Sequence, residues 1–227
     1  MKKPVFYKEL SYVFGLLFLV FATALTERAD FGMSMVVAPA YILHLKLSQV
    51  LPWFSYGVAA YVVQGGLLVI MMLILRRFRL SYLFSFVTAV LYGILVDWLM
   101  AMVAYFPADT FAWRLLWYVL GTVLCSFSIA LLFHTYLAPE AYDLFVKELS
   151  RKFGWKIDKV KTCYDCASLL ISVILSFSFF GFGQFQGVKL GTLVCALVNG
   201  FLIGQFSKLL EKHFDFQNRF GFEKYFL

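Results

Sequence analysis

Asp97 has clear potential for chemistry in this sequence, because it lies in the apolar stretch LYGILVDWLMAMVAYF. An ionisable side chain at membrane depth is costly and usually marks a pathway or a binding site. Asp97 could therefore couple the binding of a proton or cation to that of a solute. Two other interpretations stay open: the acid pairs with a nearby Arg or Lys for packing alone, or it lies close to the outer membrane interface.

Two uncharged polar residues, Gln64 and Asn199, interrupt other apolar stretches and could contact a solute. Gly65 and Gly66 follow Gln64, and such small residues allow a neighbouring helix to approach closely. Asn199 shares its stretch with Gln205 and several glycines. This polar face of small residues suits either a solute site or helix packing alone.

Charged residues at the ends of apolar stretches form a second group of candidates. Glu27, Arg28 and Asp30 follow the first stretch, where they could form an ion-paired gate, recognise a charged solute, or simply cap a helix. Arg28 lies between two acids, which indicates ion pairing. Asp165 begins a later stretch, where it could belong to a site or be an acid that the positive N-terminal end of a helix stabilises.

Cys163 and Cys166 form the motif CYDC, whose spacing fits a redox or metal-binding pair. A zinc site needs about four ligands, and no second Cys or His pair has a matching spacing. The simpler interpretation is two small apolar residues at the start of a helix. The sequence also contains no HExxH, GxSxG or P-loop motif, so we expect neither an enzyme nor a metal or cofactor.

The elements that position these residues are predicted to be membrane helices. The chain of 227 residues is 62% hydrophobic and 15% charged, whereas soluble domains are about half apolar and about a quarter charged. A membrane-spanning helix needs about 20 predominantly apolar residues. Six stretches meet that condition: 9–26, 53–75, 80–105, 112–137, 163–182 and 190–210. We therefore expect an all-α integral membrane protein surrounded by a lipid bilayer.

The basic residues indicate the orientation of these spans, because Lys and Arg favour the cytoplasmic side of a membrane. If the six spans alternate in direction, all but four of the 20 Lys and Arg residues fall on the side of both termini. The exceptions are Arg28, Lys46, Arg114 and Lys189. We therefore expect cytoplasmic termini, and a net charge of +7 that reflects membrane topology rather than nucleic-acid binding.

Two shorter segments, near 31–48 and 138–153, also have helical patterns. The first is too apolar for a surface loop and too short for a span, so we expect a helix that dips into the outer face or packs between spans. The second is amphipathic, with Glu140 and Glu148 among the charged residues opposite its aromatic face. We expect this second helix to lie at the cytoplasmic interface.

The chain also has the organisation of a duplication, in which each half contains three spans and one short helix. Residues 19–47 can be aligned with 125–153, and residues 87–99 with 194–206. The alignments match Phe21 with Phe127, Ala24 with Ala130, Leu25 with Leu131, Leu43 with Leu149, Lys46 with Lys152, Val87 with Val194, Ala89 with Ala196, Gly93 with Gly200 and Leu95 with Leu202. Because three spans per half is an odd number, the second half must be inverted in the membrane.

Three segments resemble the YczE/YyaS/YitT-like family of bacterial membrane proteins, in particular its YczE-like branch. They are ADFGMSMVVAPAYILHLKLS, RRFRLSYLFSFVTAVLYGILVD and GVKLGTLVCALVNGFLIGQFSKLL. The resemblance covers essentially the whole chain. It implies a multi-span protein of the bacterial inner membrane for which no substrate is established.

Together these patterns predict one membrane domain over 1–227, with repeats at about 9–105 and 112–212 and a cytoplasmic tail at 213–227. Inverted repeats are common in secondary transporters, whose sites lie near the membrane midplane beside interrupted helices. We therefore predict a small-solute transporter in which Asp97 is the coupling acid. The alternative is a non-transporting binding or scaffold subunit that acts with a protein partner, and a homo-oligomer is also open.

Overall fold

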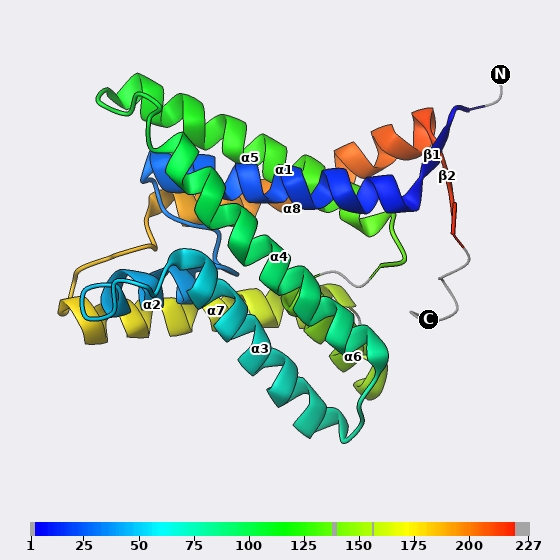
Figure 1. The fold of residues 1–227 in the computed structure, drawn as a ribbon, viewed down its shortest axis with the longest axis horizontal. Helices are drawn as coiled ribbons and strands as arrows, with labels where there is room; N and C mark the ends of the chain where they lie inside the picture. The colour runs from blue at the N-terminus through cyan, green and yellow to red at the C-terminus, as the bar shows by residue number, and fades with distance from the viewer. Residues whose placement is uncertain (1–2, 138–139, 156, 221–227) are drawn as a thin grey trace. The chain divides into compact units, whose positions relative to one another are not determined.

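The structure is a computed structural model that describes residues 3–137, 140–155 and 157–220 (Figure 1). The elements of these residues are helices, apart from two three-residue strands. In chain order they are β1 (Val5–Tyr7), α1 (Lys8–Ala29), α2 (Ala38–Leu47), α3 (Tyr56–Leu75), α4 (Leu80–Val103), α5 (Phe111–Phe133), α6 (Ala141–Phe153), α7 (Ile157–Phe180), α8 (Leu190–His213) and β2 (Asp215–Gln217).

Six of the described helices, α1, α3, α4, α5, α7 and α8, are long and apolar enough to cross a membrane. They confirm the six predicted stretches, with bounds that differ by a few residues, and they support an all-α, multi-pass membrane fold. α2 and α6 are the two predicted short helices. Residues 138–139 of the second short segment and residues 221–227 of the predicted tail lie outside the described part of the chain.

The helices form two compact units that alternate along the sequence. The first contains both strands, α1, α5, α4 from Trp98 onward, and α8 from Leu193 onward. The second contains α2, α3, α4 up to Asp97, α6 and α7. Each unit therefore takes helices from both of the predicted halves.

Small residues allow α1 and α5 to pack closely in the first unit, where they run side by side in opposite directions (Figure 1). A Cβ atom added to Gly15 would lie only 3.2 Å from the carbonyl oxygen of Ser128. A Cβ atom on Gly121 would lie 3.1 Å from the carbonyl oxygen of Ala22. At both places a glycine lets the backbone of the partner helix approach, as is common between membrane helices.

Two apolar clusters complete the core of the first unit. One joins α1 to the end of α4 and includes Phe21, Ala24, Leu25, Leu99 and Val103. The other joins α5 to α8 and includes Phe127, Ala130, Leu131, Phe206 and Leu210. In a bilayer such contacts are held by close packing, because lipid tails are as apolar as the side chains themselves.

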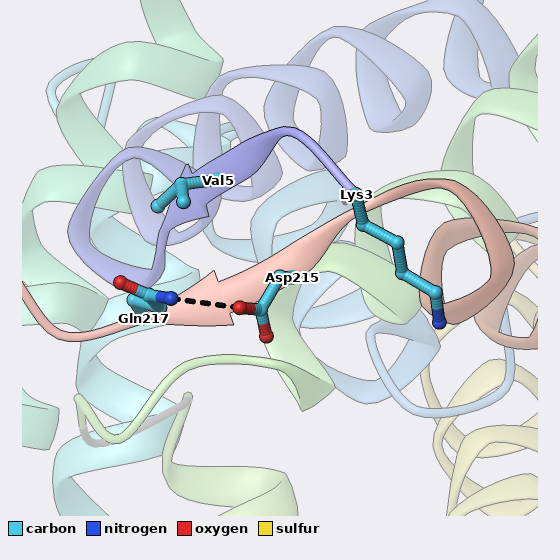
Figure 2. Close-up of a pocket in the computed structure, with 4 residues that line it drawn as sticks. All are labelled: Lys3, Val5, Asp215 and Gln217. Carbon is cyan, nitrogen blue, oxygen red and sulfur yellow. Dashed lines mark hydrogen bonds between the residues drawn. The ribbon is translucent and has the colours of Figure 1, made fainter. Parts of the chain in front are cut away.

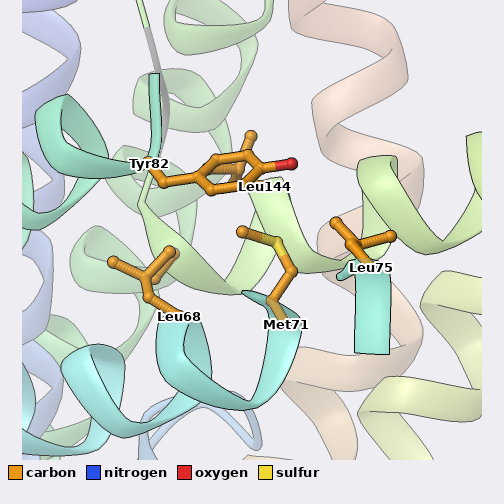
Figure 3. Close-up of a cluster of buried hydrophobic side chains, with 6 residues drawn as sticks. Leu68, Met71, Leu75, Tyr82 and Leu144 are labelled. Atoms are coloured by element: carbon orange, nitrogen blue, oxygen red, sulfur yellow. The ribbon is translucent and has the colours of Figure 1, made fainter. Parts of the chain in front are cut away.

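In the second unit, α2 and α6 each pack against both α3 and α7. A buried apolar cluster holds α6 against α3 and the start of α4 (Figure 3). Its members are Leu68, Met71, Leu75, Tyr82, Ala141 and Leu144. A short helix with neighbours on two sides buries more of its circumference than an interface helix does.

The predicted exposed charged face of α6 is accordingly wrong at Glu148. This carboxylate is buried, accepts a hydrogen bond of 3.1 Å from the Tyr82 hydroxyl, and lies 3.5 Å from Arg79. Arg151, one turn further along α6, lies 3.9 Å from the same carboxylate. The ion pairs offset the cost of removing Glu148 from solvent.

The two short strands, which were not predicted from the sequence, pair in parallel with Val5 opposite Asp215. An open pocket beside them is lined by Lys3, Val5, Asp215 and Gln217 (Figure 2). The Gln217 amide donates a hydrogen bond of 2.7 Å to the Asp215 carboxylate. These side chains are exposed, so they offer little beyond the polar groups of an ordinary protein surface.

Candidate functional site

A group of buried polar side chains lies in the second unit where α6 begins. It consists of Tyr56, Gln64, Glu140 and Tyr142 and is called the Glu140 cluster below. Tyr56 and Gln64 belong to α3, Glu140 precedes α6, and Tyr142 lies in the first turn of α6. Their exposed fractions are 1%, 0%, 8% and 2%, respectively.

The start of α6 is held by a side chain of α3. The Oε1 atom of Gln64 accepts a hydrogen bond of 3.1 Å from the backbone N–H of Ala141. The first N–H groups of a helix need partners from outside the helix, and Glu140, at the N-cap position, provides no capping bond. Because Gln64 lies near the middle of the 20-residue helix α3, α6 begins beside the middle of a candidate membrane span.

Three residues of the Glu140 cluster have a buried polar atom without a hydrogen-bond partner. These atoms are Gln64 Nε2, Glu140 Oε1 and the Tyr142 hydroxyl. Buried polar atoms are nearly always paired, and an unpaired one typically costs about 1–3 kcal/mol. Several such atoms in one place are therefore typical of a binding or functional site rather than of a packed core.

Electrostatics favour neutral side chains in this cluster. Burial is the main reason why the pKa of the Glu140 carboxyl is raised to about 8; the charge of Asp143 acts in the same direction and that of Lys161 opposes it. The pKa of the Tyr142 hydroxyl is also well above its ordinary value, because the side chain is buried and lies near Glu140. At neutral pH the Glu140 carboxyl is therefore mostly protonated.

Asp165 belongs to an ion-paired group beside this cluster. Lys161, one turn earlier on α7, places its Nζ atom 3.2 Å from Asp143 and 3.4 Å from Asp165. The charge of Lys161 is thus shared by two carboxylates. The structure brings Asp165 and Gln64, both predicted as candidates, into the same region of the second unit.

Tyrosine rings from neighbouring helices surround the Glu140 cluster. Tyr41 of α2 packs edge-on against Tyr56, with ring centroids 5.7 Å apart, and Tyr92 of α4 also lies near Tyr56. Tyr164 of α7 lies 6.5 Å from the ring of Tyr142. Rings with an apolar body and a polar tip give the cluster walls of low polarity, which strengthen electrostatic interactions inside it.

Asp97 belongs to α4, where its half-buried side chain lies beside the N-terminal end of α3. Its carboxylate accepts one hydrogen bond from Ser55 Oγ and another, of 2.7 Å, from the backbone N–H of Gly57. A Cβ atom on Gly93 would lie 2.7 Å from the carbonyl oxygen of Gly57, so α4 approaches α3 closely here. The partners found for Asp97 are thus a hydroxyl and a backbone N–H, rather than the Arg or Lys considered from the sequence.

Asn199 lies in the first unit and joins α8 to α5. Its Oδ1 atom accepts a hydrogen bond from Ser126 Oγ. Ser126 is fully buried, whereas Asn199 is half-buried. The contact is a typical polar link between membrane helices.

Glu27, Arg28 and Asp30 lie at the end of α1 in the first unit. The carbonyl of Glu27 accepts a hydrogen bond from the backbone N–H of Asp30, which ends the helix in the left-handed conformation at φ 55°. The Asp30 carboxylate pairs with Arg114 at 3.0 Å. Arg28 donates two hydrogen bonds, of 2.9 and 2.6 Å, to the Phe106 carbonyl. These contacts fix helix ends and loops within one unit.

Glu140 was not recognised as a candidate from the sequence. Its charge and its place beside an amphipathic pattern put it on the predicted charged face of α6, opposite the aromatic face. As the N-cap residue, however, Glu140 does not follow the helical periodicity, so a helical wheel is no guide to its burial. A useful signal would have been the absence of a typical N-cap residue at this position, which leaves the start of α6 in need of an outside partner.

The cysteine pair has an exposed position on α7, and both Cys163 and Cys166 are free thiols. Among the described residues, no three His, Cys, Asp or Glu side chains gather in a way that could hold a metal ion. Among the described residues, Cys163 and Cys166 are therefore not joined by a third possible metal ligand.

Comparison with known protein families gives a match that spans most of the chain and every candidate residue described above. The match is to a family of unknown function (DUF6198) and covers residues 6–208. Neither the curated proteins nor the solved structures contain a match to the chain. Nothing in the family match connects it with the YczE/YyaS/YitT-like proteins. The chain belongs to the DUF6198 family, whose function is unknown.

Proposed function

We propose that this protein is a small-solute secondary transporter of the bacterial cytoplasmic membrane, built from two inverted three-span repeats with both termini in the cytoplasm. Transporters of this plan bind their solutes near the membrane midplane, at the interface of the repeats. The main support is a set of contacts that occurs twice, with the residues of the two halves exchanged. The following contacts belong to that set.

The contacts that α1 makes with α5 are equivalent to those that α5 makes with α1. Extending the alignment of 19–47 with 125–153 toward the N-terminus matches Gly15 with Gly121, Ala22 with Ser128 and Thr26 with Leu132. Gly15 lies against the Ser128 carbonyl and the Leu132 side chain, and Gly121 lies against the Ala22 carbonyl and the Thr26 side chain. Exchanging the two halves therefore exchanges these contacts with one another, as a two-fold axis between antiparallel helices requires.

The two short helices make equivalent contacts in the second unit. Lys46 at the end of α2 donates a hydrogen bond of 3.2 Å to the Phe179 carbonyl at the end of α7. Its aligned residue, Lys152 at the end of α6, donates to the Ile74 carbonyl at the end of α3. The short helix of each half is thus bonded to the end of a span in the other half.

The two apolar clusters of the first unit also correspond to each other. The alignments, extended by one turn, match Phe21 with Phe127, Ala24 with Ala130, Leu25 with Leu131, Leu99 with Phe206 and Val103 with Leu210. The first member of each pair lies in the α1–α4 cluster and the second in the α5–α8 cluster. Chance similarity between apolar sequences would not place matched residues in matched contacts.

The solute site of this proposal is the Glu140 cluster. It lies where α6 of the second half begins beside the middle of α3 of the first half, which is the position expected at a repeat interface. Its unpaired amide, carboxyl and hydroxyl groups suit a small polar solute. Asp97 acts on this site through α3, whose N-terminus it holds.

The proposal is tested by measuring the unfolding temperature of the detergent-purified protein with a library of metabolites, ions and drugs. A compound that stabilises the wild type but not Gln64→Leu, and still stabilises the control Gln205→Leu on the exposed side of α8, is then offered to proteoliposomes. Uptake of that compound supports transport. Binding without uptake, or a co-purifying protein needed for activity, would favour the alternative of a binding or scaffold subunit.

A further inference from the structure

Glu140 combines nearly complete burial with an unpaired carboxyl oxygen. The polar and ionisable groups that face it come from three elements. They are Tyr56 of α3, Tyr142 and Asp143 of α6, and Lys161 and Tyr164 of α7. Gln64 of α3 binds the next residue, Ala141, and Asp165 of α7 pairs with Lys161. A carboxylate in such a place needs either a counter-charge or a proton.

The counter-charge nearest to Glu140 is already in use. Lys161 lies 3.2 Å from Asp143 and 3.4 Å from Asp165, so an ionised Glu140 would be a third carboxylate near a single ammonium group. The N-terminus of α6 also favours a negative charge. However, the N–H of Ala141 is bound by Gln64, and Glu140 caps none of the other first N–H groups. The balance therefore favours a neutral carboxyl.

We propose that the Glu140 carboxyl is a proton-binding site, which holds a proton in the described arrangement and exchanges it with solvent when its surroundings open. The neutral form, COOH, carries one proton on a carboxyl oxygen, and ionisation to COO⁻ transfers that proton to water. Proton binding itself requires no transport. Its use to drive solute movement rests on the proposed transporter function.

The pKa of the Glu140 carboxyl supports exchange of its proton near neutral pH. Burial raises the pKa of Glu140 from 4.5 to about 8, which lies within the range in which a cytoplasm and its surroundings differ. In the unfolded chain the carboxyl ionises near its ordinary pKa. Between the two values the folded state keeps a proton that the unfolded state has lost, so the protein loses stability as the pH rises toward about 8.

The experiment compares unfolding temperatures of the full-length protein in detergent at about pH 6 and about pH 9. The wild type should unfold several degrees lower at the higher pH. Glu140→Gln, which mimics the neutral acid, should lose most of this difference and unfold above the wild type at the higher pH. Glu148→Gln is the control: it removes another buried acid of α6, one with partners, and should keep the pH difference.

The proposal is wrong if Glu140→Gln keeps the full pH difference, or if it is less stable than the wild type at the higher pH. A second measurement needs no variant and so covers the case in which Glu140→Gln does not fold. Infrared spectra in H₂O and D₂O should show a protonated carboxylic acid band in the wild type at about pH 6 that disappears at high pH. Absence of that band would overturn the proposal. Neither measurement uses a solute. Failure of the transport assays would therefore not contradict proton binding by Glu140, and failure to detect proton binding would not contradict transport.

Discussion

At the scale of single residues, Asp97 and Glu140 show two opposite ways of keeping a carboxyl group inside a helical protein. Asp97 has two donors, Ser55 Oγ and the Gly57 N–H, at the start of α3. Glu140 has an oxygen with none. A carboxylate whose bonds are satisfied holds structure together, whereas one that lacks them is free to respond to protons or to a ligand.

Replacing Asp97 with Asn should therefore lower the stability of the protein. An amide accepts weaker hydrogen bonds than a carboxylate and lacks the negative charge that suits a helix N-terminus. We expect a loss of about 1–2 kcal/mol, seen as a lower unfolding temperature in detergent. Asp109→Asn, in the exposed loop between α4 and α5, should change nothing. Equal stability of the two variants would show that Asp97 does not hold α3.

At the scale of helices, the ends of several spans are bound by a basic side chain from another element. Arg114 donates to the Ala29 carbonyl at the end of α1, Lys46 to α7, and Lys152 to α3. The last carbonyls of a helix lack partners within it and carry partial negative charge. These cations therefore fix both the length of a span and the position of the element that provides them.

Removing either lysine of the equivalent pair should have a similar effect. Lys46→Met and Lys152→Met each leave helix carbonyls without a partner, and we expect each to cost about 0.3–1 kcal/mol. Lys147→Met, on the exposed face of α6, is the control. Unfolding temperatures measured side by side test the expectation, and a loss confined to one of the two lysines would count against equivalent repeats.

The crossing of α3 and α4 should be far more sensitive than the rest of α3. A Cβ atom on Gly57 would lie 2.0 Å from the Gly93 carbonyl oxygen, whereas one on Gly66 meets no atom within 4 Å. Gly57→Ala should thus destabilise strongly, since two backbones must separate. Gly66→Ala should be neutral or add up to about 1 kcal/mol, because alanine favours helices. Yields of folded protein and unfolding temperatures distinguish the two, and a harmless Gly57→Ala would disprove the close crossing.

At the scale of the whole molecule, the spans and short helices could be predicted because hydropathy and helical periodicity are local properties of a sequence. The candidate site could not be predicted in this way, because it depends on contacts between distant parts of the chain. The bond between Gln64 and the Ala141 N–H joins residues far apart in the chain, and the burial of Glu140 follows from that contact. Asp97 was predicted as a polar group inside the apolar helices. Its partner Ser55 is the N-cap residue of α3, but the predicted stretch 53–75 starts before it, so the end of the helix and this contact were missed.

The distribution of basic residues predicts which loops face outward. With both termini in the cytoplasm, a cysteine at Asp109 should react with a membrane-impermeant maleimide in intact cells, in a background without the native cysteines. A cysteine at Arg77, between α3 and α4, should react only after the cells are opened. The reverse pattern would invert the topology, and reaction at both sites would contradict the number of spans.

The pairing of β1 with β2 sets an order of events during synthesis. β1 precedes every described helix, and β2, its partner, is the last described element. At synthesis speeds of about 5–20 residues per second, roughly 10–40 s pass between the synthesis of β1 and that of β2. The second unit, whose helices all precede the main part of α8, can assemble during that interval. The first unit is thus begun before the second and completed after it.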